Sequence, residues 1–202
     1  MRMSYRGILS CFLLGAMSTG YAPAQTTAPS TRPAHIAATP VPIRGVGNFA
    51  MISPILYRGE QPTAEGFREL KKIGVKTVVS LRNFHSDRAL MRGTGLQYVR
   101  INSNAWNPEE EDLVVFLKVL SDPANQPVFV HCAQGADRTG FMVASHRIVE
   151  LGWTVDEAVT ELHNFKFHTV WKKVLPALNT LNPADILEKV KNAPKPDITI
   201  VP

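Results

Sequence analysis

Cysteine is scarce in this chain, with only Cys11 and Cys132 among 202 residues. Two cysteines cannot form the dense disulfide framework of a small secreted scaffold. The chain also has no apolar run near the roughly 20 residues that a membrane-spanning helix needs. A hydrophobic content of 45% with 19% charged residues is typical of a folded globular protein and not of a disordered one. The length then fits one domain with some room for tails.

The N-terminal residues have the features of an export signal. Arg2 and Arg6 form a positive start, residues 8–17 are mostly apolar, and residues 22–24 offer the small side chains that a signal peptidase selects. Cys11 lies inside the apolar run and not after it, which disfavours a lipoprotein anchor. We therefore predict a signal peptide over residues 1–24 and export to the periplasm or beyond, with no stable membrane insertion after cleavage.

Removal of this segment changes two properties of the chain. It takes away two arginines and no acid, so the formal net charge falls from +5 to +3. Such a charge suits small anionic substrates but is too weak to indicate nucleic-acid binding. Cleavage also leaves Cys132 as the only thiol, which cannot form an internal disulfide. This thiol is either a small buried apolar side chain or a reactive group.

Composition divides the rest of the chain into three parts. Residues 25–45 are rich in Pro, Thr, Ala and Ser without a hydrophobic period, which indicates a flexible linker. Residues 46–192 carry the hydrophobic patterns of a folded domain, and residues 193–202 follow it as a tail.

Short β-branched runs predict strands in the domain, and longer apolar periods predict helices. Strands that alternate with helices predict an α/β domain with a largely parallel central sheet and helices on both faces. Phe165, Phe167 and Trp171 are expected to pack in the core and not to line a pocket. The predicted strands are residues 49–52, 55–58, 76–81, 96–101 and 127–131, and the predicted helices are residues 64–73, a segment from 108, 139–151, 155–165, 168–181 and 183–192.

Residues 131–140, His-Cys-Ala-Gln-Gly-Ala-Asp-Arg-Thr-Gly, lie between a predicted strand and a predicted helix. Open α/β sheets bind ligands at the carboxyl ends of strands, and N–H groups at a helix N-terminus attract anions. Five residues separate Cys132 from Arg138, enough for the loop to wrap a tetrahedral anion while the guanidinium holds two of its oxygens. The sequence therefore predicts a phosphate site formed by Arg138 and by the backbone of Ala133, Gln134, Gly135, Ala136 and Asp137.

Cys132 lies where the same groups would stabilise a thiolate. A helix N-terminus and a nearby cation lower the pKa of a cysteine from about 8.5 by several units. We therefore expect Cys132 to attack phosphorus and form a phosphocysteine that water then hydrolyses. Thr139 is expected to hydrogen-bond the sulfur, and His131 to fix the shape of the loop. No metal or other cofactor is required, because Arg138 and the amides stabilise the charge.

The pattern His-Cys-x-x-Gly-x-x-Arg-Thr-Gly resembles the signature of the protein tyrosine phosphatase superfamily, in an exported bacterial dual-specificity form. Residues 56–62, Leu-Tyr-Arg-Gly-Glu-Gln-Pro, and residues 74–82 are similar to the opening segment of those domains, so the resemblance covers about residues 46–180. It implies the dual-specificity-like cysteine-phosphatase fold and hydrolysis of a phosphomonoester. The partner that it implies is a protein carrying phosphotyrosine or phosphoserine, or a small molecule such as a phosphoinositide or an inositol phosphate.

Two features of the loop indicate different substrates. Asp137, directly before the arginine, resembles branches of the superfamily that include phosphoinositide and broad-specificity phosphatases. The lipid-directed loops often carry a lysine, however, whereas Ala133, Gln134 and Ala136 are neutral. The sequence therefore leaves the substrate open.

The resemblance also implies a general acid, usually an aspartate on the loop after the strand at residues 96–101. Residues 102–107, Asn-Ser-Asn-Ala-Trp-Asn, contain no carboxylate. Protonation of the leaving oxygen is worth about 10²–10⁴-fold, so another residue should supply the proton. Asp87 and Asp137 are the two candidates, and Asp87 is equally a candidate N-cap of a short helix. The acids at residues 109–112 fit a helix start better.

Three other interpretations use the same loop. A rhodanese-like sulfurtransferase also holds a cysteine on an anion-binding loop, and an arsenate reductase shares the five-residue spacing. His131 and Thr139 favour a phosphatase over both, and arsenate reduction normally needs a second thiol. A non-catalytic phosphate-binding module usually lacks the cysteine or the arginine, whereas this chain keeps Cys132 and Arg138.

Overall fold

The structure is a computed structural model that describes residues 35–104 and 106–202. The predicted signal peptide and residues 25–34 of the predicted linker lie outside these described residues. The strands are β1 (Thr39–Pro40), β2 (Ala50–Ser53), β3 (Leu56–Gly59), β4 (Thr77–Ser80), β5 (Gln97–Arg100), β6 (Val128–His131) and β7 (Thr199–Ile200). The helices are α1 (Ala64–Lys72), α2 (Arg88–Met91), α3 (Glu110–Ser121), α4 (Asp137–Val149), α5 (Val155–His163), α6 (Val174–Asn179) and α7 (Pro183–Asn192), with a 3₁₀ turn at Pro123–Asn125.

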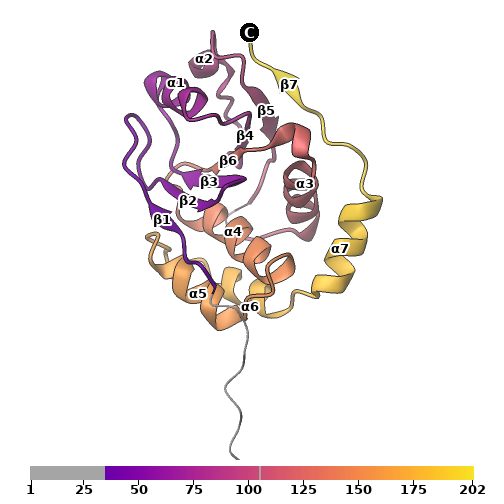
Figure 1. Ribbon diagram of the computed structural model, residues 1–202. Helices are drawn as coiled ribbons and strands as arrows, with labels where there is room; N and C mark the ends of the chain where they lie inside the picture. The colour runs from indigo at the N-terminus through magenta and orange to yellow at the C-terminus, as the bar shows by residue number, and fades with distance from the viewer. Residues whose placement is uncertain (1–34, 105) are drawn as a thin grey trace, which may run out of the picture. The chain divides into compact units, whose positions relative to one another are not determined.

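The described strands form one sheet in the order β1-β2-β3-β6-β4-β5-β7 (Figure 1). The four central strands, β3, β6, β4 and β5, run parallel, and the outer strands add to them antiparallel. The carboxyl ends of the parallel strands therefore meet at one edge of the sheet. β6, which leads to Cys132, lies between β3 and β4 in the middle of this edge.

Alternating side chains of the central strands face two hydrophobic layers. In β6, Val128 and Val130 belong to one buried cluster and Phe129 to the other. Residues of α3, α4, α5, α6 and α7 complete the first cluster, and residues of α1 and α2 complete the second (Figure 1). The predicted α/β fold, with a largely parallel sheet and helices on both faces, is confirmed.

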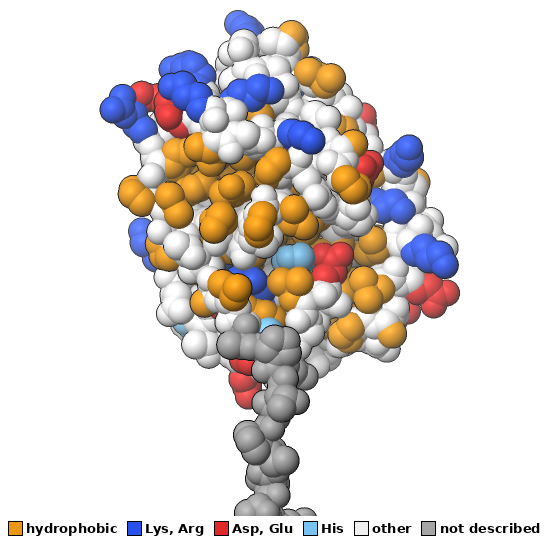
Figure 2. Space-filling model, viewed as in Figure 1, with side chains coloured by type: hydrophobic (Ala, Val, Ile, Leu, Met, Phe, Trp, Pro, Cys, Tyr) orange, Lys and Arg blue, Asp and Glu red, His pale blue; other side chains and the backbone are white. Residues whose placement is uncertain are grey.

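The surface carries no single dominant charge on the face seen in Figure 2. Hydrophobic side chains gather in the left and middle part of this face, several Lys and Arg side chains lie together above them at the upper left, and others lie along the right edge. This distribution agrees with a modest net charge. None of the helices in the described part of the chain is both long and apolar enough to cross a bilayer.

Both ends of the described chain differ from the expectation of a flexible linker and a tail. Residues 35–45 include β1, which pairs with β2. Residues 193–202 return along the sheet, where β7 pairs with β5 and Val201 is buried. Neither segment is long enough to show a hydrophobic period, so only the pairing with the sheet reveals its structure.

The helix predicted over residues 168–181 forms only at Val174–Asn179. The chain before it turns across the loop at residues 131–140. Lys166 has a positive φ of 64°, and the His168 N–H donates to the Asp137 carboxylate at 2.8 Å. A contact with a distant residue overrides the local helical preference in this segment.

Candidate active site

The loop at residues 132–136 leaves β6 and leads directly into α4. Gly135 in this loop has a φ of 63°, a conformation that side-chain-bearing residues rarely adopt. A Cβ at this position would also overlap the backbone of Gly59 at the end of β3. The loop turns tightly against β3 because a glycine occupies position 135.

The carbonyl groups of this loop point outward, toward the surrounding protein. The Gln61 N–H donates to the Ala133 carbonyl at 3.2 Å, and the Asn48 amide donates to the carbonyls of Gln134 and Gly135, each at 3.2 Å. In a trans peptide the C=O and the following N–H point in opposite directions. The N–H groups that follow these carbonyls therefore point into the loop, which is the arrangement of an anion-binding nest.

A buried arginine lies beneath the loop. Arg58 of β3 is 1% exposed, donates from Nη2 to the Gly135 carbonyl at 2.6 Å and stacks over the Phe165 ring at 4.0 Å. Burial lowers the pKa of Arg58 to about 10, while the nearby charges of Glu161 and Cys132 act in the opposite direction. Arg58 is therefore a cation at neutral pH, and it lies beneath the loop that carries Cys132.

Cys132 and Arg138 line one pocket of about 240 Å³. Arg138 Nη1 donates to the Leu81 carbonyl, just after β4, at 3.0 Å, and this bond fixes the guanidinium at the pocket. Its other N–H groups are available to an anion. Of the other residues predicted for this site, Ala133, Gln134 and Asp137 also line the pocket, whereas Gly135 and Ala136 are buried.

The opposite wall of the pocket was not predicted from the sequence. Trp106 and Trp171 line it and meet edge to face, with ring centroids 4.5 Å apart. Phe165 and Phe167 are buried, as expected, but the expectation that Trp171 does not line a pocket is wrong. The reason is the turn at residues 168–173, which carries Trp171 across the loop. The amide side chains of Asn83 and Asn104 complete the lining.

Asp87 does not line the pocket and is instead buried against His131, the residue before the loop at residues 132–136. It is fully buried, and its Oδ2 contacts His131 Nε2 at 3.0 Å, while His131 Nδ1 contacts the Cys132 carbonyl at 3.2 Å. Burial opposes ionisation of Asp87, but the hydrogen bond and charge of His131 outweigh it, so the pKa of Asp87 is lowered from its usual value. This position contradicts the prediction of Asp87 as general acid. At the start of α2 it makes no side-chain cap hydrogen bond either.

Asp137, the second candidate acid, does line the pocket. Its carboxylate accepts from the His168 N–H at 2.8 Å and contacts His168 Nδ1 at 3.0 and 3.1 Å. The His168 side chain is 48% exposed. The structure thus adds His168 to the site, a residue whose only sequence signal is its place among the aromatic residues of segment 165–171.

Thr139 lies in the first turn of α4 with its hydroxyl buried. Thr139 Oγ1 has no hydrogen-bond partner among the residues that the structure describes, Cys132 included. An unpaired buried hydroxyl is costly by about 1–3 kcal/mol. The hydroxyl is free for the contact with the Cys132 sulfur that the sequence predicts, and that contact stays a prediction.

No group of three or more His, Cys, Asp or Glu side chains within residues 35–104 and 106–202 could hold a metal ion. Cys132 is a free cysteine and is buried at the base of its pocket. The pocket therefore presents the Cys132 thiol, the Arg138 guanidinium and the Asp137 carboxylate together.

The fold and the pocket together define a class of enzyme. The chain is a cysteine-dependent phosphatase, with a thiol and a guanidinium presented to one anion-sized pocket at the carboxyl edge of a parallel sheet. It belongs to the protein tyrosine phosphatase superfamily, because the family model described as a DSP-PTPase phosphatase fused to NAD⁺ kinase matches residues 50–173.

Comparison with known proteins agrees with this assignment. The dual specificity protein phosphatase TpbA of Pseudomonas aeruginosa (strain UCBPP-PA14) is 32% identical over 168 residues, which are 83% of this chain and 73% of TpbA. A crystal structure of P. aeruginosa TpbA matches with a TM-score of 0.68 and 26% identity, covering 77% of this chain and 97% of TpbA. Inositol diphosphatase DSP3 of Arabidopsis thaliana is 26% identical over 125 residues, which are 56% of this chain and 60% of DSP3.

Proposed function

We propose that the chain hydrolyses phosphomonoesters through a phosphocysteine formed on Cys132. The observation that carries this proposal is the pocket that Cys132 and Arg138 share between β6 and α4. Cys132 Sγ attacks phosphorus, the bond to the leaving oxygen breaks, and the phosphoryl group passes to sulfur. A water molecule then attacks the phosphocysteine, which releases orthophosphate and regenerates the thiolate. Arg138 and the loop amides hold the phosphoryl oxygens in both steps.

Asp137 and His168 together are the proposed proton donor. The Asp137 carboxylate fixes the proton of His168 on Nδ1 and leaves Nε2 of the half-exposed ring free. The imidazolium gives its Nε2 proton to the leaving oxygen in the first step. The neutral imidazole then accepts a proton from the attacking water in the second. Trp171, one turn further along the same segment, lines the pocket, which supports a position of His168 at its rim.

The leaving group tests this assignment. On an alkyl phosphate, whose leaving oxygen needs a proton, His168→Asn should lower kcat about 10²-fold, and on p-nitrophenyl phosphate less than about tenfold. Asp87→Asn serves as the matched variant. Asp87 acts through His131, so this variant should lower kcat by the same factor on the alkyl phosphate and on p-nitrophenyl phosphate. If His168→Asn lowers kcat equally on both substrates, Asp137 and His168 are not the proton donor.

Phosphotyrosine is the proposed substrate. Trp106 and Trp171 offer aromatic edges and faces beside the pocket, against which a phenyl ring can pack. The crystal structure of the relative TpbA in complex with pTyr, which has a TM-score of 0.64 and 25% identity over 78% of this chain, supports the same class. An inositol phosphate is the second candidate, favoured by the similarity to the inositol diphosphatase DSP3.

Phosphate release from a panel of substrates distinguishes the two candidates. The panel contains a phosphotyrosine peptide, a phosphoserine peptide and an inositol phosphate, with Cys132→Ser as the inactive control. Trp171→Ala should raise KM for the phosphotyrosine peptide about tenfold, because stacking against one aromatic ring is worth about 0.5–1.5 kcal/mol. If no substrate turns over faster than with Cys132→Ser, the proposed activity is wrong.

The proposed site of action is outside the cytoplasm, in the periplasm or beyond. The support is the N-terminal pattern of Arg2, Arg6 and the apolar residues 8–17, together with a single thiol in the remaining chain. Fractionation of bacteria that express the full chain and a variant without residues 2–24 tests this. The full chain should appear in the periplasm as a species cleaved after residue 24, and cytoplasmic retention of both proteins would contradict the proposal.

A further inference from the structure

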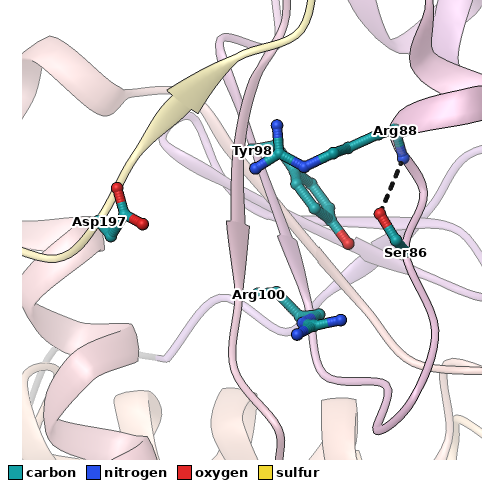
Figure 3. Close-up of a pocket in the computed structure, with 5 residues that line it drawn as sticks. All are labelled: Ser86, Arg88, Tyr98, Arg100 and Asp197. Carbon is teal, nitrogen blue, oxygen red and sulfur yellow. Dashed lines mark hydrogen bonds between the residues drawn. The ribbon is translucent and has the colours of Figure 1, made fainter.

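A second pocket, of about 280 Å³, lies at the edge of the sheet where β5 meets β7 (Figure 3). Ser86, Arg88, Tyr98, Arg100 and Asp197 line it, and none of them lines the pocket at Cys132. They come from three segments: the chain around the start of α2, strand β5, and the chain before β7. Figure 3 shows the two arginines and the tyrosine on one side and Asp197 apart from them, beside β7.

The positive charges of this pocket are not neutralised. Neither Arg88 nor Arg100 has a carboxylate within ion-pair distance among the described residues, unlike Arg147, which donates two hydrogen bonds to Glu161 at 3.0 and 2.8 Å. Arg88 is nevertheless fixed in place. Its Nη2 donates to the Thr199 hydroxyl at 2.7 Å, and its guanidinium lies over the Tyr98 ring at 5.4 Å.

Neutral donors lie beside these two cations. Ser86 Oγ accepts from the Arg88 backbone N–H at 3.4 Å, and Tyr98 Oη accepts from the Asp87 backbone N–H at 3.2 Å, so each hydroxyl proton is available to another acceptor. Two guanidinium groups and two hydroxyls match the several acceptor oxygens and the charge of a tetrahedral phosphoryl group. Asp197 is the one acid in the lining and reduces the net charge to a single positive one.

The second pocket is connected to the catalytic loop by a chain of hydrogen bonds. Tyr98 Oη accepts from the Asp87 N–H, Asp87 Oδ2 contacts His131 Nε2 at 3.0 Å, and His131 Nδ1 contacts the Cys132 carbonyl at 3.2 Å. A group that binds Tyr98 therefore contacts the first member of a chain that ends at the backbone carbonyl of Cys132.

The two pockets also share their supporting segments. Asn83 and Ser86 lie on the loop after β4, and Arg100 and Asn104 lie at the end of β5 and on the loop after it. Four residues of extended chain span at most about 14 Å, so the two pockets lie close together.

The geometry points to a second phosphoryl-binding site, formed by Arg88, Arg100, Ser86 and Tyr98 beside the catalytic pocket. Two sources supply this chemistry: orthophosphate released by the reaction, or a second phosphate group on the same substrate molecule. The binding itself does not depend on the proposed function, whereas the effect on turnover does.

Titration with orthophosphate tests the binding. Alkylation of Cys132 with iodoacetamide blocks the catalytic loop, and calorimetry then measures the remaining phosphate site. Arg100→Ala should lower the affinity for orthophosphate at least tenfold. Asp197→Asn should raise this affinity two- to fivefold, because the variant removes the one negative charge in the lining. Arg92→Ala, an exposed arginine outside the pocket, is the matched control and should leave the affinity unchanged.

The Arg100 side chain makes no hydrogen bond within the described residues. The Arg100→Ala variant therefore reports on the ligand even if Arg88→Ala, which loses the bond to Thr199, fails to fold. No binding to the alkylated wild type, or equal affinities of Arg100→Ala and Arg92→Ala, would overturn the proposal. The titration needs no turnover, so its failure and the failure of the proposed phosphatase reaction are distinguishable.

Turnover distinguishes the two sources. If the second phosphate of a substrate occupies the site, Arg100→Ala should raise KM for a doubly phosphorylated tyrosine peptide about tenfold relative to the singly phosphorylated one. If free orthophosphate occupies it, Arg100→Ala should instead remove the noncompetitive part of inhibition by added orthophosphate. If neither quantity changes, the pocket has no role in the reaction, and both of these sources are excluded as its occupant.

Discussion

At the scale of single residues, the loop after β6 is stabilised by partners for its outward-facing groups. The carbonyls of residues 132–136 all accept hydrogen bonds, from His131, Gln61, Asn48, Arg58 and the Gly140 N–H. Buried carbonyls without partners would be costly, so these bonds are what allow a loop with so many inward N–H groups to persist. The anion therefore meets amides that are already oriented before it binds.

Gly135→Ala tests the tight contact of this loop with β3. A Cβ at position 135 would overlap the backbone of Gly59, so we expect kcat/KM to fall at least about 10²-fold, because the amides and Cys132 move away from the phosphoryl group. Gly152→Ala is the matched control. Gly152 has a similar φ of 68° with nothing within 4 Å of the added Cβ, so this variant should lose only about 1 kcal/mol of stability and keep its activity.

Steady-state kinetics and urea denaturation of both variants measure these effects. Two variants with equal activity would mean that the contact between Gly135 and Gly59 does not shape the site.

Sequence reasoning could identify the residues of the site that lie close together in the chain. Cys132 and Arg138 are within one short motif, whereas Asn48 and Arg58 reach Gly135 over separations of 87 and 77 residues. Such partners are fixed by tertiary packing, which no local pattern reports. Asp87 shows the same limit: its place after β4 was predicted, but its burial against His131, and with it a positioning role, was not.

At the scale of elements, the start of α3 contains an acid with one unpaired carboxylate oxygen. Asp112 Oδ2 is buried and has no hydrogen-bond partner among the described residues. Burial raises the pKa of Asp112, the charges of Glu109 and Glu111 raise it further, and a hydrogen bond from Ser103 opposes them. The acids at residues 109–112 were predicted as ordinary helix-start residues, whose negative charge interacts favourably with the helix dipole. Because the pKa of Asp112 is raised, this interaction is weaker at Asp112.

The sign of this shift gives a pH-dependent prediction. When an acid has a higher pKa in the folded than in the unfolded state, the protein loses stability as the pH rises. The loss begins near the pKa of the unfolded state, about 3.8, and is complete above the pKa of the folded state. Asp112→Asn should therefore raise the free energy of unfolding by about 1 kcal/mol at pH 7 and change it little at pH 3.

Urea denaturation at the two pH values measures the difference for Asp112→Asn. Asp156→Asn, an exposed first-turn acid of α5, is the control and should show no such gain at pH 7. A gain of the same size at pH 3 would exclude ionisation of Asp112 as its cause.

Lys118 connects α3 to α7 through hydrogen bonds. It interrupts the apolar positions of α3, and its Nζ donates to the carbonyls of Val190 and Lys191, in the last turn of α7, at 2.9 and 3.1 Å. A cation at a helix C-terminus satisfies carbonyls that have no partner within the helix. Lys118→Met should lower the free energy of unfolding by about 1–2 kcal/mol, measured by urea denaturation. Lys191→Met, an exposed lysine of the same turn, should change it by less than about 0.5 kcal/mol.

The central strands and most of the longer helices were predictable because each buries a local apolar pattern. The strand expected at residues 127–131 forms at Val128–His131, and the helix expected at residues 183–192 forms at Pro183–Asn192. Segment 168–173 was not predictable, because the bond from His168 to Asp137 and the contact of Trp171 with Trp106 decide its path. A local sequence pattern does not predict a segment whose path depends on packing with one distant residue.

At the scale of the whole molecule, the sheet ends in very short strands on both sides. β1 and β7 have two residues each, and β1 contains Pro40, which cannot donate a backbone hydrogen bond. Short edge strands with proline resist pairing with another chain. Without β7, the edge of β5 would be open, and the second pocket would lose Asp197 and Thr199 from its border.

Val201 tests how firmly the end of the chain belongs to the fold. It is 4% exposed in the cluster that contains Leu96, and its N–H donates to the Leu96 carbonyl at 3.0 Å, whereas the neighbouring Ile200 is 68% exposed. Val201→Ala should lower the free energy of unfolding by about 2 kcal/mol, and Ile200→Ala by less than about 0.5 kcal/mol, in urea denaturation. Equal effects would mean that residues 193–202 only lie along the sheet edge, and Asp197 and Thr199 would then give the second pocket no fixed wall.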